Sequence, residues 1–193
     1  MSEGPLTKVA AKTAAELSPR VPLSEPAKAL LQEKQTPEQY LKLLADKGNL
    51  PDAIQLLAHA LPKREAVGWA WQCAKEAYGP NPQPKFAAAL EAARRWVADP
   101  NEERRYQAKP AAEAADYGTP AGLCAAAAFW SGGSFGPPDQ KPIPPDEKLT
   151  PKGVGGAILL AGLLGAPDQA MARYRRFLEL GLGIGRGAMP WKT

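Results

Sequence analysis

The stretch TPEQYLKLLADKGN, residues 36–49, indicates most clearly which type of fold the sequence encodes. It opens like a helix, because Thr36 is a favourable N-cap, Pro37 suits the first turn and Gln39 completes a capping box. The apolar side chains that follow recur at helical spacing: Tyr40, Leu43 and Leu44. A glycine near the end stops the helix. We therefore predict an amphipathic helix that lays one face on a core.

The same succession of cap or proline, apolar stripe and stop recurs along the chain. It predicts further helices at 24–34, 51–61, 63–79, 81–99, 101–116, 119–130, 150–165 and 167–187. No segment alternates with period two, so we predict no sheet. Helix pairs recur about every 35–40 residues, but they share no repeat signature. The prediction is an all-α fold, an array or bundle of about eight to nine antiparallel helices.

The chain reads as one domain with a looser beginning. Residues 1–22 are polar and weakly patterned, which predicts a flexible segment, with a short helix at 7–17 as the alternative. Residues 23–193 form the predicted helical domain. A long Pro-rich strap at 131–150 interrupts it.

The composition supports a helical core and limits the kinds of partner that the protein is expected to bind. Hydrophobic residues make up 45% of the 193 residues, and the formal net charge is +4. Within 150–193, six basic residues stand against two acidic ones: Lys152, Arg173, Arg175, Arg176, Arg186 and Lys192 against Asp168 and Glu179. So small an excess permits contact with an acidic partner but does not require nucleic acid, and we do not expect a nucleic-acid partner.

The cysteines and the apolar runs predict a compartment. Cys73 and Cys124 each lie in a helix-like apolar segment, as buried reduced thiols do. The N-terminus lacks the apolar run of a secretory signal, and the longest apolar stretch, 154–166, is too short for a bilayer. We expect a soluble cytoplasmic protein with no membrane partner.

Candidate catalytic and cofactor motifs are weak. The glycines at 183–188 follow a helix and not a strand, so they read as a fraying helix end and not as a dinucleotide site. His59 is the one histidine, and catalysis would need it beside Cys73 or Cys124 with an orienting carboxylate such as Asp52 or Asp116. A packed helix residue is the favoured interpretation. We expect no enzyme activity, no cofactor and no metal.

Paired charges are interpreted as solvated surface. Adjacent acidic residues such as Glu102 and Glu103 point about 100° apart on a helix and do not converge. The arginine pairs at 94–95, 104–105 and 175–176 lie on different helices, and we expect their stems to lie along the surface. Phosphate binding by these pairs is the less favoured alternative.

The stretch FWSGGSFGPPDQKPIPP, residues 129–145, allows three interpretations. A proline-rich chain loses little entropy when it lies along a surface, so a strap packed across the helices is favoured. Its anchors would be Phe129, Trp130, Phe135 and Ile143. The second interpretation is a docking surface for another protein. An active-site loop is least favoured, because only Ser131 and Ser134 accompany it.

Five tryptophans without a catalytic set suggest a protein-binding surface. The helix at 63–79 is apolar on two faces, which places it between neighbours or at an interface. An aromatic groove beside arginines is typical of binding hot spots. The candidate partner-binding residues are Trp69, Trp71, Phe129, Trp130, Phe135, Arg175, Arg176 and Trp191.

Three stretches together resemble a known family: LAHALPKREAVGWAW at 57–71, AAAFWSGGSFGPP at 126–138 and RYRRFLELGLGIGRG at 173–187. It is an uncharacterised bacterial family of all-helical cytoplasmic proteins, associated with gene clusters of type VI secretion and related contractile systems. The resemblance implies an adaptor, chaperone or accessory factor of such a system and carries no catalytic residues. Residues 69–97 also resemble the helical domain of toxin-immunity proteins, so an immunity protein that inhibits a cognate toxin is the alternative.

Overall fold

The computed structural model describes residues 4–136 and 140–192, and over these residues the fold is all-α, as predicted. The described chain forms ten α-helices, three short 3-10 helices and no strand. The α-helices are α1 (Ala14–Leu17), α2 (Glu25–Ala29), α3 (Pro37–Asp46), α4 (Leu50–Ala60), α5 (Lys63–Tyr78), α6 (Pro84–Ala98), α7 (Glu102–Ala115), α8 (Pro120–Phe129), α9 (Leu149–Leu163) and α10 (Ala170–Gly185). The 3-10 helices are η1 (Ser18–Arg20), η2 (Pro167–Gln169) and η3 (Pro190–Lys192).

Side-chain capping marks several of the helix starts. The capping box between Thr36 and Gln39 is present at the start of α3, as predicted. Ser24 and Thr119 likewise accept backbone N–H groups at the starts of α2 and α8. The start of α9 differs from the prediction, because it begins one residue early and buries Thr150 inside its first turn.

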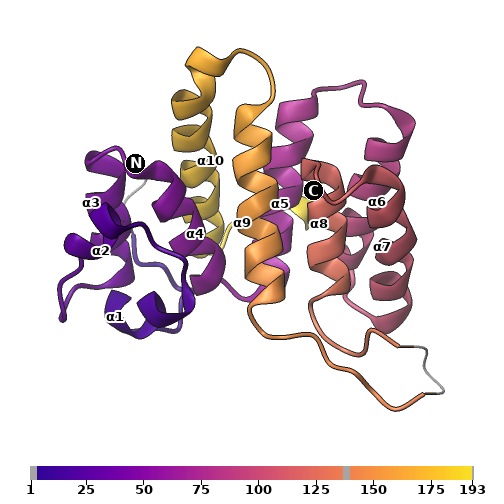
Figure 1. Ribbon diagram of the computed structural model, residues 1–193, viewed down its shortest axis with the longest axis horizontal. Coiled ribbons are helices and arrows are strands. Elements are labelled where there is room, and N and C mark those ends of the chain that lie inside the picture. Colours follow the sequence, from indigo (N-terminus) through magenta and orange to yellow (C-terminus); the bar gives the residue numbers. More distant parts are fainter. Residues whose placement is uncertain (1–3, 137–139, 193) are drawn as a thin grey trace.

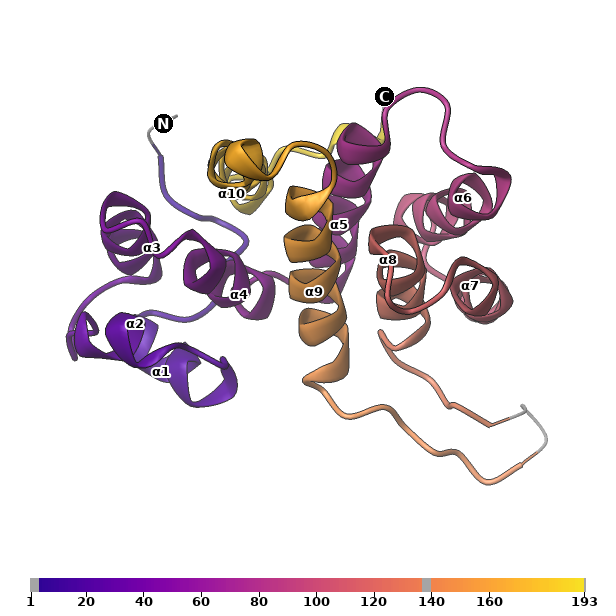
Figure 2. The same cartoon turned by 45° about the horizontal axis from the view of Figure 1, so that its top comes forward.

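The helices gather around a central pair (Figures 1 and 2). Helices α1–α4 lie at one end and α6–α8 at the other, while α5 and α9 pack against each other between them. Helix α10 packs on α4, α5 and α9. No helix in the described part of the chain combines enough length and apolar character to traverse a bilayer.

Small residues bring the central helices close together. The four successive alanines 125–128 of α8 are all buried. Gly162 of α9 faces the Tyr174 ring of α10, and Gly181 of α10 faces the Trp69 ring of α5. A β-carbon at either glycine would overlap the facing ring, so these glycines set the spacing between helices.

The described part of the N-terminal segment packs on the domain, which differs from the predicted flexible tail. Leu6 is buried, and the Lys8 N–H donates to the Gly185 carbonyl at 2.9 Å. The Arg186 Nε donates to the Gly4 carbonyl at 2.8 Å. Apolar side chains along the segment, among them Leu17 and Val21, are also buried in the core. Residues 1–3 lie outside the described part.

The Pro-rich loop, residues 131–148 between α8 and α9, does not form the predicted strap across the helices. Its described parts, 131–136 and 140–148, extend away from the helical body on the side of α7 and α8 in both views (Figures 1 and 2). Of the predicted anchors, Phe129 is buried, Trp130 and Phe135 are partly buried, and Ile143 is exposed. Residues 137–139, within the predicted strap, lie outside the described part.

Candidate functional site

The predicted tryptophan groove does not form, because most of its members are core residues. Trp69 is fully buried, and its indole N–H donates to the Phe177 carbonyl at 2.7 Å. The Trp191 ring packs directly on Gly68 of α5. Trp71 is 8% exposed, with the Lys75 ammonium 5.2 Å from its ring centroid. The prediction that Trp69, Trp71 and Trp191 contact a partner is therefore wrong. They pack in the core, because α5 is covered on both of its apolar faces.

The two predicted arginines lie apart from the aromatic residues of the loop. Arg175 and Arg176 are exposed on α10, where Arg176 pairs with Glu76 at 3.4 Å. Exposed pairs of this kind contribute little to stability. The structure therefore brings together only part of the predicted set, namely Phe129, Trp130 and Phe135 at the base of the Pro-rich loop.

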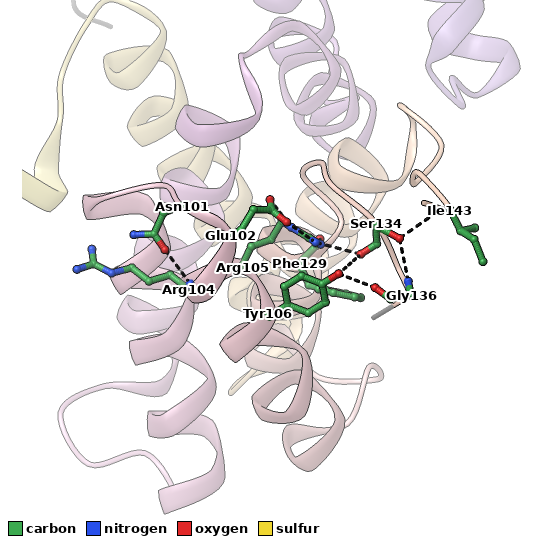
Figure 3. A network of polar contacts seen from close by, with 9 residues as sticks. All are labelled: Asn101, Glu102, Arg104, Arg105, Tyr106, Phe129, Ser134, Gly136 and Ile143. Carbon is green, nitrogen blue, oxygen red and sulfur yellow. Dashed lines mark hydrogen bonds and ion pairs between the residues drawn. The ribbon is translucent and has the colours of Figure 1, made fainter. Parts of the chain in front are cut away.

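Arg105 holds that base in place (Figure 3). Its side chain is almost fully buried, and its Nη1 donates to the Phe129 carbonyl at 2.7 Å. Its Nη2 donates to the Ser134 carbonyl at 3.0 Å and to the Glu102 carboxylate at 2.9 Å. The hydrogen bond from Arg105 to Glu102 holds the pKa of the Glu102 carboxyl below its usual range. One guanidinium thus ties α7 to the end of α8 and to the loop.

Tyr106 and Ser134 continue the network into the loop (Figure 3). The Tyr106 hydroxyl lies 2.6 Å from the Gly136 carbonyl and 3.2 Å from the Ser134 carbonyl. The Ser134 Oγ accepts the N–H groups of Gly136 and Ile143, both at 3.0 Å. The Phe135 N–H donates to the Ile143 carbonyl at 2.9 Å, so the two described limbs of the loop are bonded to each other.

The outer limb of the loop, residues 140–144, is exposed to solvent. Ile143 is 59% exposed, and Pro142 and Pro144 beside it are also exposed. At the base, Tyr117 stacks on Trp130 with ring centroids 6.1 Å apart and planes within 14°. Tyr117 is itself exposed. Exposed apolar and aromatic side chains therefore occur both on the loop, at Ile143, and at its base, at Tyr117.

The two cysteines and the histidine considered for catalysis lie in buried or partly buried surroundings. Burial raises the pKa of the Cys73 and Cys124 thiols, which makes both poor nucleophiles. His59 Nδ1 lies 2.9 Å from the Gln55 carbonyl of its own helix. Within residues 4–136 and 140–192, no three histidine, cysteine or acidic side chains are grouped to hold a metal ion.

Five arginines of the predicted pairs lie at the surface, but Arg105 does not. Arg94 and Arg95 both bind Glu91, and the hydrogen bond from Arg94 lowers the pKa of Glu91 to about 2. Arg105 was missed although the sequence carries a signal for it. It shares the buried stripe of α7 with Ala108, Ala112 and Ala115, so helical spacing alone places it inward.

A family of unknown function, DUF6931, matches residues 40–185, about three quarters of the chain. The chain belongs to DUF6931. No curated protein and no solved structure matches this chain. The DUF6931 match contains Arg105, Tyr106 and the whole Pro-rich loop, whereas Trp191 and the docked segment 4–22 lie outside it.

Proposed function

We propose that this DUF6931 chain is a non-catalytic protein-interaction module whose docking element is the outer limb of the Pro-rich loop. One observation supports this most: a buried arginine and a tyrosine fix the base of a loop whose Ile143 stays 59% exposed. Anchoring lowers the entropy that a partner must remove on binding.

The chemistry of the loop suggests the kind of partner. Proline fixes φ near −65°, so residues 142–145 favour an extended conformation before any partner binds. Grooves lined by aromatic rings accept such segments, with an apolar side chain between the prolines as anchor. The proposed partner is a protein with an aromatic-lined groove that receives Ile143 and the flanking prolines.

The wider role rests on the resemblance of the sequence. It favours an adaptor, chaperone or accessory factor of a type VI or related secretion system, acting in the bacterial cytoplasm. The immunity alternative relied on residues 69–97, whose Trp69 and Trp71 are buried and are not available to a toxin. We therefore place the immunity role second.

The test compares two matched substitutions on exposed apolar residues. Ile143→Asp lies in the loop, and Leu163→Asp lies at the end of α9 with nearly equal exposure, 59% against 58%. Partners captured by the tagged full-length protein are identified by mass spectrometry, purified and titrated with both variants. We expect Ile143→Asp to abolish binding and Leu163→Asp to leave it unchanged.

A second pair of substitutions tests the extended conformation. Replacing Pro142 and Pro144 by glycine keeps the loop length and frees the backbone, so binding should weaken on the order of tenfold. Equal affinities for all variants would rule out the loop as the docking element. Loss of a secretion-system component in the Ile143→Asp capture supports the adaptor role, and loss of one toxin supports the immunity role.

A further inference from the structure

Between Pro142 and Pro145, the backbone of the loop offers a partner hydrogen-bond acceptors but no donors. Proline has no N–H group, and three of these four residues are proline. The fourth residue, Ile143, already donates its N–H to the Ser134 Oγ at 3.0 Å. The Ile143 carbonyl is occupied as well, because it accepts from the Phe135 N–H at 2.9 Å. The backbone groups left for a partner are therefore carbonyls.

Two of these carbonyls, on Pro142 and Pro144, have no donor within the part of the chain that the structure describes. Both prolines are exposed, whereas Pro145 is buried, so the accessible segment ends at Pro144. A partner that added a strand to this segment would need donors as well as acceptors from its backbone. The segment instead suits a groove whose own side chains donate the hydrogen bonds.

The outer limb carries a positive charge near its N-terminal end. Lys141 is exposed, and no carboxylate of the described residues lies within ion-pair distance of its ammonium. The acidic residues that follow the limb are engaged within the chain, since Asp146 accepts the backbone N–H of Lys148 at 2.7 Å. Glu147 pairs with the Lys63 ammonium at 2.9 Å. Within the limb, the charge that a partner can pair with is therefore the Lys141 ammonium.

We propose that the partner's groove combines aromatic donors with an acidic end, an inference that rests on the proposed function. Tryptophan or tyrosine side chains of the groove pack on Pro142 and Pro144 and donate their N–H or O–H groups to the two carbonyls. A carboxylate at one end of the groove pairs with the Lys141 ammonium. Because the cation lies at one end of the limb, the reverse direction of binding loses this pair, so the limb binds in one direction.

Binding rates test the acidic end of the groove. The probe is the purified protein that the full-length chain captures and that the Ile143→Asp variant fails to bind. Surface plasmon resonance compares the parent chain with Lys141→Gln and with the matched control Lys148→Gln, which removes an exposed cation beyond the limb. We expect Lys141→Gln to slow association about three- to tenfold at low salt and to lessen its salt dependence, because a peripheral charge acts mainly on association. Lys148→Gln should change the rate by less than about twofold.

Substitutions in the same probe test the hydrogen bonds to the carbonyls. Exposed tryptophans and tyrosines of the partner are replaced one at a time by phenylalanine, which keeps an aromatic ring and removes the N–H or O–H donor. We expect at least one of these replacements to weaken binding to the full-length chain on the order of tenfold, mainly through faster dissociation. Circular dichroism confirms that each partner variant is folded.

The outcomes distinguish failure of this inference from failure of the proposed function. Equal effects of Lys141→Gln and Lys148→Gln, or full affinity in every donor-free variant of the partner, overturn the inference. In either case, loss of binding in Ile143→Asp still supports the loop as the docking element. If Ile143→Asp binds as tightly as the parent chain, or if no captured protein depends on Ile143, the proposed function fails and this inference fails with it.

Discussion

The Arg105 guanidinium lies at the C-terminal end of α8, where carbonyl groups lack donors within the helix. Its bond to the Phe129 carbonyl supplies one donor, and its charge suits the negative end of the helix dipole. The ring faces of Tyr106 and Phe129 lie against the guanidinium, with ring centroids 4.4 and 5.0 Å from its central carbon. A buried cation is tolerated here because hydrogen bonds and ring faces surround it.

Arg105→Met should lower the free energy of unfolding by about 1–3 kcal/mol, because the buried Phe129 carbonyl loses its donor and the partly buried Ser134 carbonyl keeps only Tyr106. Glu102 is 64% exposed at its side chain and adds little to this loss, since water can solvate it. Urea denaturation followed by circular dichroism measures the change. Arg104→Met is the control, because Arg104 forms partly exposed contacts with Asp99 and should lose less than about 1 kcal/mol. Equal losses would contradict a special role for Arg105.

Helices α9 and α10 approach each other through glycine, so their spacing depends on the absence of a side chain. Gly162→Ala would place a methyl group within the Tyr174 ring, and we expect a loss of about 1–3 kcal/mol in the free energy of unfolding. Gly183→Ala is the matched control within α10. No atom of another described element lies within 4 Å of its added carbon, so it should stabilise the protein by about 0.5–1 kcal/mol through helix propensity. Thermal unfolding of both variants distinguishes packing from propensity, and destabilisation by Gly183→Ala would contradict this account.

The elements themselves could be predicted because their signals are local. Caps such as Thr36 and Thr119 lie within four residues of the groups they bind, so the sequence shows them directly. Thr150 was expected as the first residue of its helix, but α9 begins at Leu149, because a threonine before a proline also fits within the first turn of a helix. The burial of Trp69 and Trp71 depends on which helices cover α5, and helical periodicity does not contain that information.

At the scale of the whole molecule, the described N-terminal segment is joined to the end of α10. Leu6 packs beside Gly185 near the end of α10, and Arg186 binds both the Gly4 carbonyl and the Glu38 carboxylate. The contacts between segments so distant in sequence could not be read from local patterns. They make the described N-terminal segment part of the same core as α3, α4 and α10.

If the N-terminal segment belongs to this core, a substitution within it should destabilise the entire domain. We expect Leu6→Ala to lower the free energy of unfolding by about 2 kcal/mol, because the leucine is buried among residues of the core. Thr7→Ala, on an exposed neighbour, should stay within about 0.5 kcal/mol of the parent. Circular dichroism reports the helices and tryptophan fluorescence reports the distant α5, so coincident shifts of both transitions in Leu6→Ala indicate one cooperative unit. A separate early transition, or no shift of the fluorescence transition, would show that the segment unfolds independently of α5.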